Sequence, residues 1–93
     1  MSRQSNQAVG FALLARAYAG AGELDRAVNA WQQAIDLAPD NENYYLRLGD
    51  AWLDAGDPDQ AIAAYRQALQ RAPDNEYALR QLEKLGAQPA STP

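Results

Sequence analysis

Two residue types with versatile chemistry are absent from this chain of 93 residues, which contains no cysteine and no histidine. Without cysteine the chain has neither disulfide bonds nor thiolate nucleophiles. Without histidine it lacks the commonest general base and the commonest metal ligand. No hydrophobic run approaches the length that crosses a membrane. These absences argue against an enzyme, and they favour a protein with no metal and no cofactor.

Positive charge is scarce as well. Lys and Arg number 8 against 12 Asp and Glu, which gives a formal net charge of -4. A phosphate backbone is repelled overall by such a chain, so nucleic acid is not an expected partner. The first ten residues, MSRQSNQAVG, lack the apolar core of a signal peptide. We therefore expect a cytoplasmic location without membrane insertion, although the missing signal carries no information if the sequence is part of a longer chain.

What the chain does have is an internal repeat. The phrase APDNE begins at Ala38 and again at Ala72, an offset of 34 residues. Residues 8–41 and 42–75, aligned at this offset, are identical at 13 positions. Several other positions exchange similar side chains, such as Trp31 with Tyr65. A period of 20–50 residues is typical of units that bury their apolar faces by stacking on one another. We call residues 8–41 the first unit and residues 42–75 the second unit.

Each unit reads as two helices. Phe11, Leu14 and Tyr18 recur at helical spacing in the first half of the first unit, and Ala27, Trp31 and Ala34 do so in the second half. Breaks in the pattern predict helices near 8–21, 25–38, 42–55, 58–72 and 75–86. The expected breaks and caps are Gly22 and Gly56 within the units, Asp57 with Pro58, the prolines 39 and 73, and Asp40/Asn41 or Asp74/Asn75.

Small residues alternate with aromatic rings along the units. Ala27, Ala34, Ala61 and Ala68 are spaced around the rings of Trp31 and Tyr65. Gly49 lies inside a helix, where glycine costs about 1 kcal/mol relative to alanine. Because Ala15 occupies the equivalent place in the first unit, we interpret Gly49 as a point of close helix approach.

With this pattern the chain resembles the tetratricopeptide repeat family. The family signature of an aromatic, Leu-Gly, Tyr, Ala, an aromatic, Ala and Pro is matched in both units. The matching residues are Phe11, Leu14, Ala15, Tyr18, Ala27, Trp31, Ala34 and Pro39, then Tyr45, Leu48, Gly49, Trp52, Ala61, Tyr65, Ala68 and Pro73. Ala15 replaces the signature glycine. The resemblance implies an all-α, right-handed solenoid of antiparallel helix pairs with five helices.

The chain outside the two units is short. Residues 1–7 are expected to be a lead-in, residues 76–86 a capping helix, and residues 87–93 a flexible tail. In the capping helix Leu79, Leu82 and Leu85 are expected to cover the end of the second unit.

The resemblance also implies a function, because family members generally act as scaffolds for other proteins. The first helix of each pair would line a concave groove for a short peptide segment of a partner. The groove positions that we carry over are Arg16, Asn43, Leu46, Arg47, Asp50, Leu53, Asp54, Tyr77, Arg80 and Lys84, with Val9, Ala12, Leu13 and Gln81 beside them. Leu46, Leu53 and Tyr77 are the expected anchors.

Alternatives remain open at this point. Asp50 and Asp54 lie four residues apart and either meet a basic partner or form a solvated face. They are also the only pair that resembles an acid–base dyad, but no apolar pocket is expected to separate their pKa values. The rival to peptide binding is a structural role, either self-assembly or a spacer in a larger protein. We expect a monomer or a weak dimer.

Overall fold

The computed structural model of the chain describes residues 3–89, with side chains from Asn6 onward. Its five helices are α1 (Arg3–Gly20), α2 (Leu24–Leu37), α3 (Glu42–Asp54), α4 (Pro58–Arg71) and α5 (Glu76–Lys84). Residues 3–89 contain no strand, so the all-α prediction is confirmed. The predicted lead-in and tail fall partly outside this range, at residues 1–2 and 90–93.

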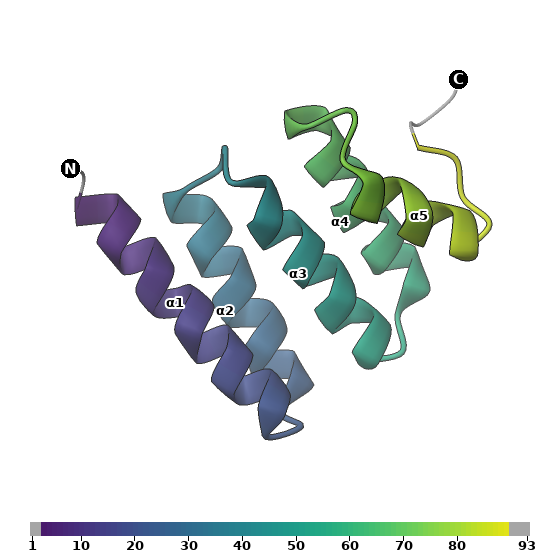
Figure 1. The fold of residues 1–93 in the computed structure, drawn as a ribbon. Coiled ribbons are helices and arrows are strands. Elements are labelled where there is room, and N and C mark those ends of the chain that lie inside the picture. Colours follow the sequence, from purple (N-terminus) through teal and green to yellow (C-terminus); the bar gives the residue numbers. More distant parts are fainter. Residues whose placement is uncertain (1–2, 90–93) are drawn as a thin grey trace.

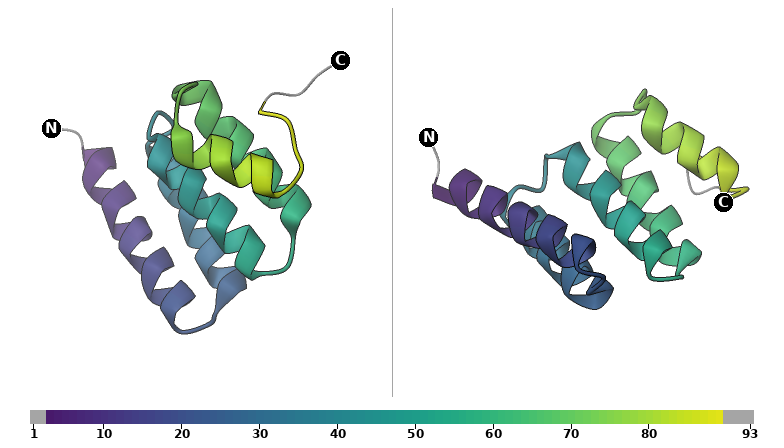
Figure 2. Two further views of the ribbon diagram at one scale, coloured as in Figure 1. Left: turned by 45° about the vertical axis from the view of Figure 1, so that its right-hand side comes forward. Right: turned by 60° about the horizontal axis from the view of Figure 1, so that its bottom comes forward.

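The helices form a row of antiparallel pairs in chain order (Figure 1). α1 packs on α2 and α3 packs on α4, while α2 joins the two pairs by packing on α3, and α5 packs on α4. In Figures 1 and 2 the first helices of the pairs, α1 and α3, lie on the same side of the row as α5. The molecule is therefore a short solenoid of two helix pairs and one additional helix.

The ends of the helices follow from local chemistry. The Oδ1 atoms of Asn41 and Asn75 accept hydrogen bonds at 3.0 Å from the backbone N–H groups of Asn43 and Ala78, so the asparagine of each joint is the capping residue. Asp57 caps α4 by accepting the N–H of Gln60 at 3.2 Å. Gly22 and Gly56 have φ angles of +79° and +83°, which explains why glycine ends the first helix of each pair.

One predicted boundary is wrong. α1 begins at Arg3, not near residue 8, so most of the expected lead-in is helical. The segment before Ala8 contains neither proline nor glycine that would stop a helix, and Ala8 itself is buried with 1% of its surface exposed. The helical pattern therefore continues toward the N-terminus beyond the aligned units.

The core consists of two clusters that meet at α3. The first cluster lies between α1, α2 and the adjacent face of α3, around Trp31. The second lies between α3, α4 and α5, around Tyr65 and Leu82, which are fully buried. Leu79 and Leu85 pack against the second cluster, so α5 covers the end of the second unit as the sequence predicts.

Gly49 is the point where α3 and α4 come closest. A Cβ atom built on Gly49 would lie 2.6 Å from Cε1 of Tyr65, which is shorter than van der Waals contact allows. Since the Tyr65 ring is fully buried, it has no open space into which it could move. The predicted close approach at Gly49 is confirmed.

Candidate interaction groove

A hollow lies on the side of the solenoid formed by the first helices. It measures about 590 Å³ and is lined by Ala12, Arg16, Trp31, Asn43, Tyr44 and Arg47. We call these six residues the inner groove. Ala12 and Arg16 come from α1, Trp31 from α2, and the other three from α3. The groove therefore spans the junction between the first unit and the second.

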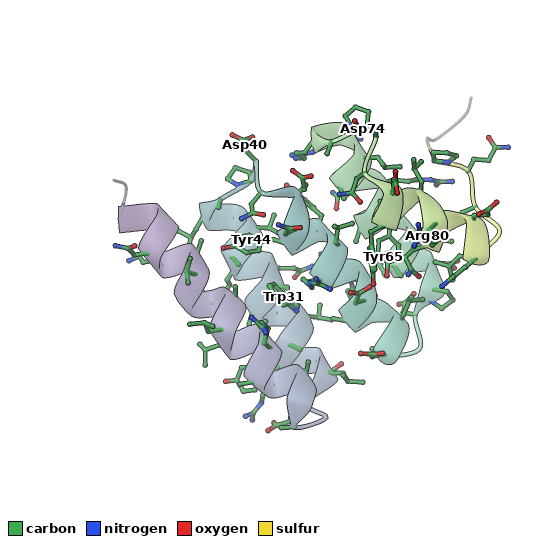
Figure 3. All side chains as sticks on the ribbon, viewed as in Figure 1. Trp31, Asp40, Tyr44, Tyr65, Asp74 and Arg80 are labelled. Atoms are coloured by element: carbon green, nitrogen blue, oxygen red, sulfur yellow. The ribbon has the colours of Figure 1, made fainter. Side chains whose placement is uncertain are left out.

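Two aromatic rings form the apolar part of the inner groove. The centroids of Trp31 and Tyr44 are 6.0 Å apart with the rings tilted by 40°, a geometry typical of favourable aromatic pairs. Figure 3 shows both residues on the same side of α3, with Tyr65 on the other side. Trp31 is 5% exposed, so its ring is firmly packed and only a small part of it is open to the groove.

The charged groups that line the inner groove are both guanidinium groups, from Arg16 and Arg47. Both side chains are exposed, although Arg47 also forms an ion pair with Asp50 at 3.1 Å. No carboxylate is among the lining residues. The groove is thus locally positive on a chain whose net charge is negative.

The neighbouring junction, between the second unit and α5, is different because Asp50 organises a polar cluster there. Oδ1 of Asp50 accepts hydrogen bonds from the hydroxyl groups of Tyr65 at 2.6 Å and Tyr77 at 2.8 Å. Oδ2 of Asp50 accepts the bond from Arg47 at 3.1 Å. We call Arg47, Asp50, Tyr65 and Tyr77 the Asp50 cluster; it ties α3 to both α4 and α5.

The cluster also perturbs its two tyrosines. Burial, followed by the hydrogen bond and the negative charge of Asp50, raises the pKa of Tyr65 strongly. The same causes raise the pKa of Tyr77, against a lowering effect of Arg47. The rings of Tyr65 and Tyr77 meet edge to face with their centroids 6.3 Å apart. Both hydroxyl groups therefore remain protonated donors near neutral pH.

Comparing residues 34 positions apart explains why the first junction contains a hollow and the second is filled by side chains. The inner-groove positions shifted by 34 are Leu46, Asp50, Tyr65, Tyr77, Ala78 and Gln81. At the second junction Leu46 replaces the small Ala12, and Tyr77 replaces Asn43. Leu46 is 5% exposed and packs in the second core cluster, while Tyr77 reaches across to Asp50. The second junction is occupied by the protein's own side chains.

The structure brings together three of the ten predicted groove residues, Arg16, Asn43 and Arg47, in one hollow. Leu46, predicted as a groove anchor, is only 5% exposed, because its side chain packs in the core between α3, α4 and α5. Asp50 is not a free carboxylate, since three side chains of the chain itself already bond to it. Leu53 is half-buried against the same core cluster.

The remaining predicted residues lie away from the inner groove or at its margin. Asp54 is exposed near the C-terminal end of α3. Tyr77 is 39% exposed, but its hydroxyl belongs to the Asp50 cluster. Arg80 lies 3.9 Å from Glu76 and lines a separate hollow with Leu79 and Glu83 at the α5 end. Lys84 is exposed in the last turn of α5.

Sequence reasoning missed the roles of Tyr44 and Tyr65. Tyr44 was not among the expected groove residues, although it follows Asn43 and stands where the first unit has Gly10. The hydroxyl of Tyr65 was also overlooked. The signal for it was a paired exchange, in which Trp31 becomes Tyr65 where Arg16 becomes Asp50, so that a donor and an acceptor appear together in the second unit.

Two further findings limit the chemistry of the part that the structure describes. No group of three or more acidic side chains that could hold a metal ion occurs among residues 3–89. No helix in the same range is both long and apolar enough to span a membrane.

Comparison with known proteins agrees with the helix-pair architecture. The family model described as tetratricopeptide repeat matches residues 13–76, which include most of the first unit and all of the second. The search among curated proteins gave no significant match. Tetratricopeptide repeats generally mediate protein–protein interaction and are typically non-catalytic. The repeat offset, the paired helices and this match lead to one conclusion: the chain belongs to the tetratricopeptide repeat family.

Proposed function

We propose that the chain is an interaction module that binds a short segment of a partner protein in the inner groove. The observation that carries the proposal is the open hollow at the junction of α1, α2 and α3, lined by two arginines and an aromatic pair. At the second junction the equivalent positions hold the buried Leu46 and Tyr77, which is bonded to Asp50. A segment bound at the first junction contacts both units at once.

The lining of the groove indicates which partner chemistry suits it. Arginine presents a planar fork of donors that pairs well with carboxylates. Trp31 and Tyr44 offer a surface for an apolar or aromatic side chain. Asn43 adds an amide that can donate to and accept from a peptide backbone. The favoured ligand is therefore a short acidic segment that carries one apolar or aromatic residue.

The size of the hollow limits the affinity. One junction accommodates only a few residues, so the interface is far smaller than that of a stable complex. We expect a dissociation constant of about micromolar magnitude. Because the arginines are exposed, added salt screens their attraction for carboxylates and weakens binding.

A peptide titration tests this proposal. The probe is an eight-residue peptide with two glutamates beside one phenylalanine, and the comparison peptide has lysines in place of the glutamates. In a Trp52→Phe background the remaining tryptophan is Trp31, whose fluorescence reports on the groove. We expect the acidic peptide to change this fluorescence saturably and the basic peptide to leave it unchanged.

Two arginine variants locate the binding surface. Arg16→Glu reverses a charge in the groove and is expected to weaken the acidic peptide at least about tenfold, which corresponds to about 1.4 kcal/mol. Arg80→Glu makes the same change on an exposed arginine outside the groove and is the matched control. Equal binding by both variants would show that the groove is not the site.

A further inference from the structure

The outer surface of α1 is apolar to an unusual degree for an exposed helix. Val9, Leu13 and Leu14 are exposed by 51%, 59% and 47%. From Asn6 to Gly20 the one charged residue of the helix is Arg16, which belongs to the inner groove. A helix that is apolar on all sides is usually covered on all sides.

A continuous depression lies between α1 and α2, and of these three residues Leu14 lines it. One hollow of about 590 Å³ is lined by Gln7, Gly10, Phe11, Leu14, Gln33, Asp36 and Leu37. A second, of about 320 Å³, shares Phe11, Leu14 and Gln33 and continues to Tyr18, Arg26, Asn29 and Ala30. We call the residues of these two hollows the end face. Within residues 3–89 no element covers it.

The equivalent residues of the second unit lie on α3 and are covered by the first unit. Leu48 is the equivalent of Leu14, and Leu48 is only 5% exposed because it packs in the core cluster of the first unit. Tyr44 and Trp52, the equivalents of Gly10 and Tyr18, pack against the same cluster. The end face therefore consists of the same repeat positions that, in the second unit, pack against a neighbouring unit.

The opposite end of the solenoid differs from the end face, because its hollow of about 530 Å³ is lined by charged residues such as Arg80 and Glu83 beside Leu79. α5 covers the second unit there, and its own Ala78 and Leu82 are fully buried against that unit. A second copy added head to tail would place its apolar end face on these charged residues of α5. The apolar surface that a second copy presents is its own end face, and pairing of identical surfaces is the rule for two-fold dimers.

We propose that the end face binds the end face of a second copy of this chain in a two-fold dimer with antiparallel α1 helices. Leu14 lies at the middle of the depression, because both hollows share it, and it marks the two-fold axis. Gly10 leaves open space beside it, since no atom lies within 4 Å of a Cβ built there. The partner helix can therefore approach α1 closely.

The charges at the two ends of the depression complement one another under this symmetry. Asp36 lines one hollow and Arg26 lines the other, and the two hollows lie at opposite ends of the depression. An antiparallel two-fold pairing brings Arg26 of each copy, which is bridged to Glu23 of its own chain at 3.3 Å, to Asp36 of the other, so that two identical ion pairs form across the dimer. A parallel arrangement would instead bring like charges together. Charge complementarity thus selects the antiparallel dimer.

The first experiment measures the mass of the 93-residue chain by sedimentation equilibrium from about 1 µM to 1 mM. We expect a reversible monomer–dimer equilibrium with a dissociation constant in the micromolar range, as is usual for a small interface. Leu14→Glu places a charge at the centre and should weaken the dimer at least tenfold. Gln67→Glu adds the same charge at an exposed position of α4 and should leave the dimer unchanged.

The second experiment tests the orientation by charge exchange. Arg26→Asp and Asp36→Arg should each weaken self-association, because each creates two like-charge contacts in the dimer. An equimolar mixture of the two variants should form a heterodimer as tightly as the unmodified chain, since both ion pairs are then restored. Circular dichroism of each variant confirms that the helices are retained.

Several outcomes would overturn the proposal. A chain that stays monomeric up to 1 mM has no dimer, and its end face then belongs to another partner or to another segment. A dimer that is insensitive to Leu14→Glu uses a different surface. Failure of the mixed variants to pair better than either variant alone would exclude the antiparallel two-fold arrangement.

Discussion

The two units have the same arrangement of helices but differ in the side chains at the junction that follows each of them. In the first unit Arg16 and Trp31 line the inner groove and Ala15 is buried, and in the second unit Asp50, Tyr65 and Gly49 occupy the equivalent positions. The first set leaves a hollow of about 590 Å³ at its junction. The second set builds a hydrogen-bonded cluster that closes its junction. The difference separates a unit that offers a surface from a unit that secures the end of the solenoid.

The exchange of one ring for another explains much of this contrast. Tyr65 carries a hydroxyl that reaches Asp50, whereas the indole N–H of Trp31 has no carboxylate at the equivalent place, where Arg16 stands. The Tyr65 ring also comes within 2.6 Å of a Cβ built on Gly49, a closeness that only glycine allows. Gly49, Asp50 and Tyr65 thus act as one set, and exchanging one of them alone should be costly.

The largest expected effect is at the glycine. Gly49→Ala should lower the free energy of unfolding by about 1–3 kcal/mol, because the new methyl group overpacks the buried Tyr65 ring. Helix propensity alone predicts the opposite, a gain of about 1 kcal/mol. Gly10→Ala is the matched control, since its helix position has open space, and it should raise the stability by about 0.5–1 kcal/mol.

Urea unfolding below the concentration of self-association measures both variants. The two substitutions are chemically identical and differ only in what the methyl group meets. A gain in stability for both would mean that α3 and α4 do not approach as closely as the structure has them.

A somewhat smaller effect is expected at the acceptor of the cluster. Asp50→Ala should cost about 1–2 kcal/mol, because the hydroxyl of the buried Tyr65 then loses its hydrogen-bond partner. Arg16→Ala, at the equivalent position of the first unit, should change stability by no more than about 0.5 kcal/mol because Arg16 is exposed. Thermal or urea unfolding of both variants makes the comparison. Similar losses for both would remove the distinction between the units.

Much of the fold could be predicted from the sequence because the information is local. The offset of 34 residues, the glycine breaks and the asparagine caps depend on neighbours a few residues apart, and the structure confirms them. The close approach at Gly49 could also be predicted, since the equivalent position of the first unit holds another small residue, Ala15. The start of α1 could not, because no residue near it signals a boundary.

The candidate site was less predictable because it depends on contacts between distant residues. Asp50 bonds to Tyr65 and Tyr77, which are 15 and 27 positions away, and no local pattern joins them. Leu46 occupies a groove position by register, yet its length carries it into the core, whereas the short Ala12 leaves the equivalent space open. Register identifies which residues face a surface, and side-chain size decides whether a groove exists there.

The smallest expected effect is a dependence of stability on alkaline pH that belongs to the second unit. Burial and the bond to Asp50 raise the pKa of Tyr65 above the ordinary tyrosine value of about 10, so the unfolded chain releases this proton at lower pH than the folded chain. The contribution of Tyr65 is therefore complete below pH 10 and is lost as the pH rises above it, by at most about 1.4 kcal/mol per pH unit. Tyr65→Phe should reduce the loss of stability between pH 9 and pH 10.5, measured by urea unfolding. Tyr44→Phe is the control, because its ring lies against Trp31 and outside the Asp50 cluster. If Tyr65→Phe and the unmodified chain lose stability equally over this interval, the hydroxyl of Tyr65 is not held protonated by its surroundings, and the second unit differs from the first in shape alone.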